Sequence, residues 1–181
     1  MDDCSRFRVL GLYPRRAGKY TLQFLERVIE EMPFPIQRIQ TDRGTEFFAE
    51  PVQRFLKDSL IKFRPIPPRS PYMNGKVERS QATDLQEFWA NRASPSLADA
   101  EDLECWQFDY NWRRPHGSLQ GKTPIDRIGE VRDQTPDRED IALKFDATRE
   151  PLRFSNWRAD MAAKTARQVQ QVRKKTPVET D

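Results

Sequence analysis

The sequence predicts an α/β domain in which short strands alternate with amphipathic helices. Three observations support this fold class: apolar residues recur at helical spacing in several segments, runs rich in strand-forming residues lie between those segments, and prolines or a glycine turn separate most of them. Alternation of strands with helices is typical of a layered α/β structure.

Three strands and two helices are expected in the first part of the chain. Residues 6–13 are rich in Phe, Val, Leu and Tyr and predict a strand. Apolar residues on one face predict a helix over 17–32, and a short strand at 36–40 follows and ends at the turn TDRG. A helix is expected to begin at Pro51, because proline is favoured in a first helical turn. Alternation of apolar residues then predicts a strand over 61–66.

Two longer helices are expected after a proline-stiffened connector. Asn74 is a plausible N-cap for a helix from Gly75 to about Asn91. A second helix over 96–112 would bury Leu103, Trp106 and Tyr110. Residues 130–156 fit no element clearly, whereas 157–175 could form a basic helix.

Composition limits the chemistry that the chain can carry. It is polar, with 33% charged residues and a mean hydropathy of −0.87. No apolar run approaches the ~20 residues of a membrane span and no signal peptide opens the chain, so we expect a cytoplasmic protein without membrane contact. Cys4 and Cys105 lie far apart without a CxxC spacing, and one histidine excludes any zinc site that needs two. Carboxylates are therefore the expected reactive groups.

The net charge of +3 is unevenly distributed along the chain. Residues 1–98 carry 16 Lys/Arg against 12 Asp/Glu, residues 99–150 carry 8 against 13, and residues 151–181 carry 7 against 3. A basic core and a basic tail on either side of an acidic connector favour a polyanion as partner. A solvated surface explains the charge about as often.

Two carboxylates have informative positions. Asp42 follows an expected strand just before a glycine turn, and the carboxyl ends of strands are where open α/β sheets place ligand sites. Glu78 lies in the first turn of an expected helix, where the helix N-terminus favours its ionised form. Oxygen ligands without nearby histidine or thiolate suit Mg²⁺ or Mn²⁺. By position alone, a turn-forming Asp42 and a surface Glu78 are equally good interpretations.

A family resemblance favours the metal interpretation. TDRGTEFF and PRSPYMNGKVERS, with 35 residues between Asp42 and Glu78, resemble the second half of the D…D…E signature of retroviral integrases and bacterial insertion-sequence transposases. Arg43 stands where that family usually has asparagine. The downstream YNWRRPHGSLQGKTP resembles the phrase that closes these transposase cores, and DDCSRF resembles the turn before their third strand. The resemblance covers about residues 2–126.

The resemblance implies an RNase H-like fold, a five-stranded mixed sheet flanked by helices. It implies three carboxylates that hold two Mg²⁺ or Mn²⁺ ions for DNA strand cleavage and transfer, with Asp42 on one ion and Glu78 on the other. A homo-multimer assembled on element ends and target DNA is implied as well. The catalytic core would span residues 1–127, followed by a connector and basic tail over 128–181.

The first carboxylate of the family signature is not found in this sequence. The family has it on a strand before the DDCSR turn, so we expect a core without its first two strands. Asp2 and Asp3 lie in the turn itself and are poor substitutes. A chain lacking this ligand is expected to be inactive alone. A transposase remnant that at most binds DNA, and an RNase H-like nuclease, are the alternatives; the RPHGSL phrase argues against the second.

Several further residues are candidates for DNA contact. Lys76 and Arg79 flank Glu78, and Asn74 and Gly75 precede it by one helical turn, so all four could lie against phosphates. Solvated surface is the alternative. The remaining candidates are Arg43, Arg114 and His116, and for the last two an anchoring role in the final helix is favoured over phosphate contact. Residues 151–175, with seven Lys/Arg and one acid, are expected to bind DNA without sequence preference.

Overall fold

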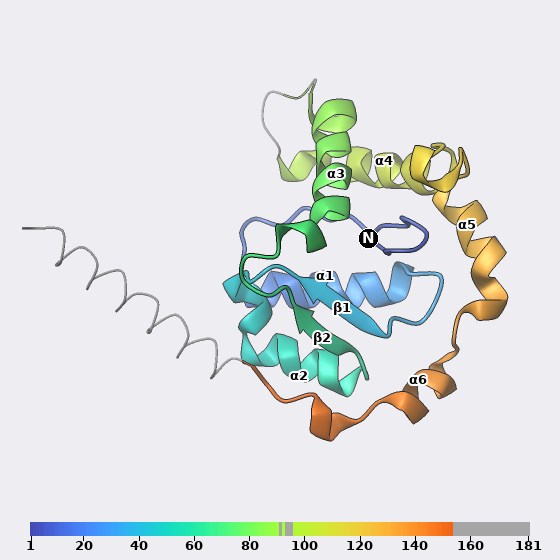
Figure 1. The fold of residues 1–181 in the computed structure, drawn as a ribbon. Helices are drawn as coiled ribbons and strands as arrows, with labels where there is room; N and C mark the ends of the chain where they lie inside the picture. The colour runs from blue at the N-terminus through green and yellow to red at the C-terminus, as the bar shows by residue number, and fades with distance from the viewer. Residues whose placement is uncertain (91, 93–95, 154–181) are drawn as a thin grey trace, which may run out of the picture.

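A two-stranded parallel sheet lies at the centre of the molecule (Figure 1). The computed structural model describes residues 1–90, 92 and 96–153. Strand β1 (Arg38–Thr41) pairs in register with β2 (Lys62–Pro65), so that Arg38 lies opposite Lys62 and Thr41 opposite Pro65. Both strands were expected from the sequence, with bounds shifted by one or two residues.

Helices α1 (Gly18–Glu31) and α2 (Glu50–Asp58) pack against each other beside the sheet, and both were expected. A Cβ on Gly18 would lie 2.8 Å from the Cβ of Ala49, so only glycine allows this close approach of α1 to the start of α2. Pro51 lies in the first turn of α2, as expected. The hydrophobic core at this contact consists of Leu25, Phe48, Val52, Leu56, Ile61 and Phe63.

Helices α3 and α4 form a second layer, which lies above the strands in Figure 1. Helix α3 (Gly75–Thr83) continues into a π-helical segment, η3 (Asp84–Trp89), and α4 spans Ala100–Trp112. A one-turn segment, η4 (Leu97–Asp99), leads into α4 and begins with a capping box between Ser96 and Asp99. The expected burial of Leu103 and Tyr110 is confirmed, and Trp106 is half-buried.

The chain from α4 onward wraps around the outside of the molecule and returns to α2 (Figure 1). It contains α5 (Pro124–Val131) and α6 (Arg138–Lys144), in the region where the sequence pattern was weak. The boundary expected after residue 127 falls inside α5. Glu150 fastens the end of this segment to β2, because its carboxylate accepts hydrogen bonds of 2.6 and 2.5 Å from Arg64. The helix expected over 157–175 lies outside the described residues.

The strand expected at residues 6–13 is not present, and this expectation was wrong. The segment pairs with no strand, and side chains of α4 bond to its backbone instead. The Arg8 N–H donates to Asn111 Oδ1 (3.0 Å), Asn111 Nδ2 donates to the Arg8 carbonyl (2.7 Å), and the Leu10 N–H donates to Gln107 Oε1. Gln107 and Asn111 lie one turn apart, so their amides meet alternate residues of an extended chain.

The described residues contain no helix long and apolar enough to cross a membrane.

Candidate carboxylate site

Asp42 directly follows β1 and begins the turn that the sequence indicated. Its Oδ1 accepts a hydrogen bond of 3.1 Å from the Gly44 N–H, and its own carbonyl accepts one of 2.8 Å from Thr41 Oγ1. The side chain is exposed. The turn therefore fixes one carboxylate oxygen and leaves the side chain open to a ligand.

Glu78 lies in the first turn of α3 and is also exposed. Its N–H donates to the Asn74 carbonyl (3.0 Å), and Asn74 Nδ2 lies 3.4 Å from its Oε1, at the long limit of a hydrogen bond. The helix begins at Gly75 as expected, but the Asn74 side chain does not cap it. It points instead toward the Glu78 carboxylate.

The structure places Asp42 and Glu78 at the same edge of the sheet. The ladder continues one residue past the end of β2, through a hydrogen bond of 2.8 Å from the Ile66 N–H to the carbonyl of Thr41, the last residue of β1. Gln40, on β1, donates from Nε2 to the carbonyl of Met73 at 3.2 Å. Met73 directly precedes Asn74, so this hydrogen bond ties the strand before Asp42 to the start of the helix that carries Glu78.

The donor chemistry of this edge fits a hard divalent cation, because both side chains offer exposed carboxylate oxygens. No third ligand joins them, since the part of the chain that the structure describes contains no group of three His, Cys, Asp or Glu able to hold a metal. Asp2 is occupied by the backbone N–H groups of Cys4 and Ser5 and by the Ser5 hydroxyl. Asp3 forms an ion pair of 2.7 Å with Lys76. Neither aspartate completes a three-ligand cluster with the other two.

The basic candidates near Glu78 differ in their surroundings. Lys76 is held by Asp3, whereas Arg79 is exposed and has no hydrogen bond or ion pair from its guanidinium to any described residue. A Cβ on Gly75 would meet nothing within 4 Å, so packing within the described protein does not require glycine there. Arg43 follows Asp42 in the turn and is half-buried.

Arg114 and His116 lie away from this edge, against α4 and η3. Arg114 Nε donates to Glu87 Oε2 (2.9 Å), and its guanidinium lies 5.7 Å from the Tyr110 ring centroid. His116 is buried edge-on against the Tyr110 ring, with 4.5 Å between ring centroids, and its Nε2 lies 3.4 Å from the Tyr110 carbonyl. Burial lowers the pKa of His116, which favours the neutral ring. The contacts of Arg114 and those of His116 both favour a role in anchoring the final helix over a role in phosphate contact.

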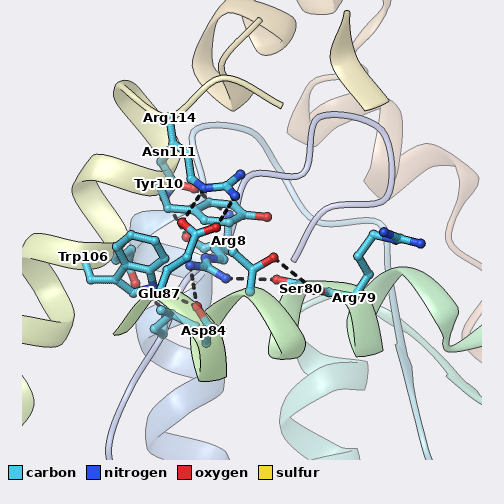
Figure 2. A network of polar contacts seen from close by, with 12 residues as sticks. Arg8, Arg79, Ser80, Asp84, Glu87, Trp106, Tyr110, Asn111 and Arg114 are labelled. Carbon is cyan, nitrogen blue, oxygen red and sulfur yellow. Dashed lines mark hydrogen bonds and ion pairs between the residues drawn. The ribbon is translucent and has the colours of Figure 1, made fainter. Parts of the chain in front are cut away.

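Sequence reasoning missed a buried polar cluster around Arg8 (Figure 2). The Arg8 side chain is only 1% exposed and contacts Ser80, Asp84 and Tyr110. One signal was available: an arginine between Phe7 and Val9 interrupts an apolar run. The pattern could not show that all three residues are buried, because the partners of Arg8 lie 72 to 103 residues further along the chain.

A shallow hollow of about 400 Å³ lies elsewhere on the molecule. Residues Pro33, Phe34 and Pro35 line it on one side and the chain around 128–139 on the other. It contains neither candidate carboxylate, and no reactive constellation lines it. The exposed edge that carries Asp42 and Glu78 is the better candidate, because it offers carboxylate oxygens to a cation.

Two family models, one viral protein and one solved structure that resemble this chain all carry the word integrase in their descriptions. Two families, both described as "Integrase core domain", match residues 1–71 and 59–124. The ORF3 protein of Spiroplasma virus SpV1-C74, described as a candidate integrase, is 30% identical over 148 residues, which cover 72% of this chain but only 41% of the viral protein. The crystal structure of the catalytic core domain of BIV integrase matches with a TM-score of 0.54 and 18% identity, covering 67% of this chain and 77% of that core. The likeness of the two structures confirms the RNase H-like fold class.

Proposed function

We propose that this chain, which belongs to the integrase core domain family, provides part of a site that cleaves DNA strands and transfers them during DNA integration. The observation that carries the proposal is the placement of Asp42 and Glu78 at one edge of the sheet, tied by the hydrogen bond from Gln40 to Met73. Transposition of an insertion sequence is the process in which we place this activity, with element ends and target DNA as substrates.

The carboxylates are prepared for a cation by their immediate surroundings. The Gly44 N–H orients the Asp42 side chain, and Glu78 lies in the first turn of α3 with its carboxylate exposed. Mg²⁺ or Mn²⁺, when bound, would supply charge to activate a nucleophilic oxygen and to stabilise a leaving one at phosphorus. Asp42 and Glu78 would hold one ion each, as the family resemblance implies.

The surface beside Glu78 suits the DNA backbone. Arg79 offers an exposed guanidinium, and the open space over Gly75 lets a phosphodiester approach the first turn of α3. Lys76 would exchange Asp3 for a phosphate. We propose Asn74 and Arg43 as further contacts of the same strand. Contacts of this kind position DNA without reading its sequence. For Arg114 and His116 the buried or paired surroundings favour a role in holding the fold.

A DNA-binding protein without catalysis is the second candidate. It is favoured by one observation: among the described residues, Asp42 and Glu78 have no third carboxylate within reach. The chain also spans only 41% of the length of the viral relative that it matches. We propose strand cleavage, multimer formation on DNA and a cytoplasmic location for a protein that carries the complete site. An RNase H-like nuclease would share the carboxylates but would join no strands.

The test compares Asp42→Asn and Glu78→Gln with the parent chain. Mn²⁺ affinity, measured by water-proton relaxation, should fall about 10-fold or more in each variant, because each loses an anionic ligand. DNA affinity without metal should stay within about 2-fold, since the phosphate-contacting cations are unchanged. In a protein that supplies the third carboxylate, strand joining should fall more than about 100-fold.

Asp58→Asn is the matched control, because Asp58 is an exposed carboxylate at the end of α2. It should leave Mn²⁺ and DNA affinity unchanged. Joining above about a hundredth of the parent rate in either site variant, or Mn²⁺ affinity that depends equally on Asp58, would contradict the proposal. DNA affinity with no Mn²⁺ site would identify the non-catalytic alternative.

A further inference from the structure

Arg8 enters the interior between α3 and α4 from the N-terminal segment (Figure 2). Its backbone is fixed by Asn111, which accepts from the Arg8 N–H (3.0 Å) and donates to the Arg8 carbonyl (2.7 Å). Its guanidinium lies over the Tyr110 ring, 3.2 Å from the centroid. Main chain and side chain of one residue are therefore both held by α4.

The same guanidinium also contacts the helix that carries Glu78. Arg8 Nη1 donates to Ser80 Oγ (3.0 Å), and Nη2 lies 2.6 Å from Asp84 Oδ1, in ion-pair contact without hydrogen-bond geometry. Asp84 Oδ1 also accepts from Trp106 Nε1 (2.7 Å), which ties it to α4. Ser80 and Asp84 are four residues apart and so lie on one face of the helix. Arg8 thus contacts α3 and its continuation at two points of their inner face.

Glu78 points away from that inner face. Each residue of an α-helix turns by about 100°, so Glu78 lies about 200° around the axis from Ser80. This agrees with the burial, since Ser80 is buried and Glu78 is exposed. A rotation of α3 about its axis would therefore move Glu78 sideways along the sheet edge, and the two contacts made by Arg8 oppose that rotation.

Stability alone is a poor explanation for this arrangement. Burial of an ion pair removes both charges from water, and the attraction between them often fails to offset that loss. Arg8 Nε also has no hydrogen-bond partner within the described residues, and burial lowers the pKa of the guanidinium. A hydrocarbon side chain would fill the space at lower cost but would not distinguish one rotational setting of α3 from another.

We propose that Arg8 is a positioning residue for Glu78, which sets the rotation of α3 and so the place of the Glu78 carboxylate relative to Asp42. This inference rests on the proposed function, because it takes Glu78 to be a ligand of a divalent ion. Arg8 contacts neither the ion nor the DNA and acts only through Ser80 and Asp84.

The test is a double-mutant cycle in Mn²⁺ affinity between Arg8→Lys and Glu78→Gln, on the full chain. Lysine keeps the charge but cannot reach Ser80 and Asp84 together. With Glu78 present, Arg8→Lys should weaken Mn²⁺ binding by about 10-fold, the size of effect that residues orienting a ligand commonly have. With Glu78→Gln, the same substitution should change nothing, because no ligand remains to be misplaced. Ser80→Ala removes one contact and serves in the same cycle if Arg8→Lys fails to fold.

Arg92→Lys is the matched control. Arg92 also pairs with acids (Asp99 and Asp102) and lies 3.8 Å from the Phe88 ring centroid, but it has no contact with Ser80 or Asp84. It should affect Mn²⁺ affinity equally with and without Glu78. Equal losses for Arg8→Lys in both backgrounds, or no loss at all, would overturn the inference while leaving the metal site intact. An Mn²⁺ affinity that changes in neither Asp42→Asn nor Glu78→Gln would instead refute the proposed function, and the positioning role with it.

Discussion

Charged side chains at the sheet edge are exposed to solvent, whereas Arg8, between α3 and α4, is buried. Asp42 and Glu78 are exposed, and each accepts one local hydrogen bond, from Gly44 and Asn74 respectively. Arg8 is buried, and its guanidinium is in contact with a hydroxyl, a carboxylate and an aromatic ring. The difference separates two uses of charge: exposed oxygens at the edge remain available to a ligand, whereas the buried contacts of Arg8 hold two helices together.

The largest loss of stability should come from Asn111→Ala, a substitution in the interior between α3 and α4. It leaves the Arg8 N–H and carbonyl without partners in a buried place, and each orphaned group costs about 1–3 kcal/mol. We expect a loss of about 2–6 kcal/mol in the free energy of unfolding, measured in urea. Asn111→Asp keeps the acceptor for the Arg8 N–H but sets a buried carboxylate oxygen against the Arg8 carbonyl, so it should not restore the lost stability. If Asp42→Asn proves as destabilising as Asn111→Ala, the division between an open edge and a structural interior is wrong.

A smaller loss of stability is expected from Glu150→Gln, which weakens the attachment to Arg64 of the segment that follows α4. The hydrogen bonds from Arg64 hold the pKa of Glu150 below its usual range. A depressed carboxyl pKa stabilises the fold above the ordinary value of about 4.5 and loses that contribution as pH falls through the lowered pKa. Because Arg64 is 37% exposed, solvent screens the pair, and we expect about 1–2 kcal/mol at pH 7.

Thermal unfolding of the parent and Glu150→Gln across pH 7 to 3 measures this contribution. The two curves should converge at the acid end. Glu139→Gln, an exposed acid in the first turn of α6, is the control and should follow the parent. A constant difference between parent and Glu150→Gln at every pH would show that packing, and not the charge of Glu150, fastens this segment.

The smallest effect on stability should come from Asp3→Asn, which breaks the exposed pair with Lys76. Exposed ion pairs contribute about 0–1 kcal/mol, so unfolding should hardly change. DNA binding should become stronger and more salt-dependent, because Lys76 no longer has to leave Asp3, with a slope of log affinity against log salt steeper by up to roughly 0.9. Asp133→Asn, in the segment that follows α5, is the control. Asp2→Asn would not serve, because Asp2 holds the N-terminal turn. An unchanged slope would place Lys76 outside the DNA contact.

Local pattern was sufficient for much of the fold, and it also singled out the two candidate carboxylates. The helices at α1, α2 and α4 follow from apolar residues at helical spacing, and the phrases around Asp42 and Glu78 identify the candidate site because family motifs are local in sequence. Non-local pairing was not predictable. Residues 6–13 have strand composition, yet a strand also needs a ladder partner, and Gln107 and Asn111 replaced it from a helix about 100 residues away. The burial of Arg8 has the same origin.

The π-helical segment η3 gives its helix a place where one residue can be lost. Residues in such a turn bond five positions apart in place of four, so η3 holds one residue more than an α-helical turn would. Removal of an exposed residue of η3, such as Gln86, would restore an α-turn and leave Phe88 near its present place against Trp106. A deletion inside α4 is not absorbed in this way, because it would rotate everything beyond it by about 100° and turn Tyr110 or Asn111 away from Arg8.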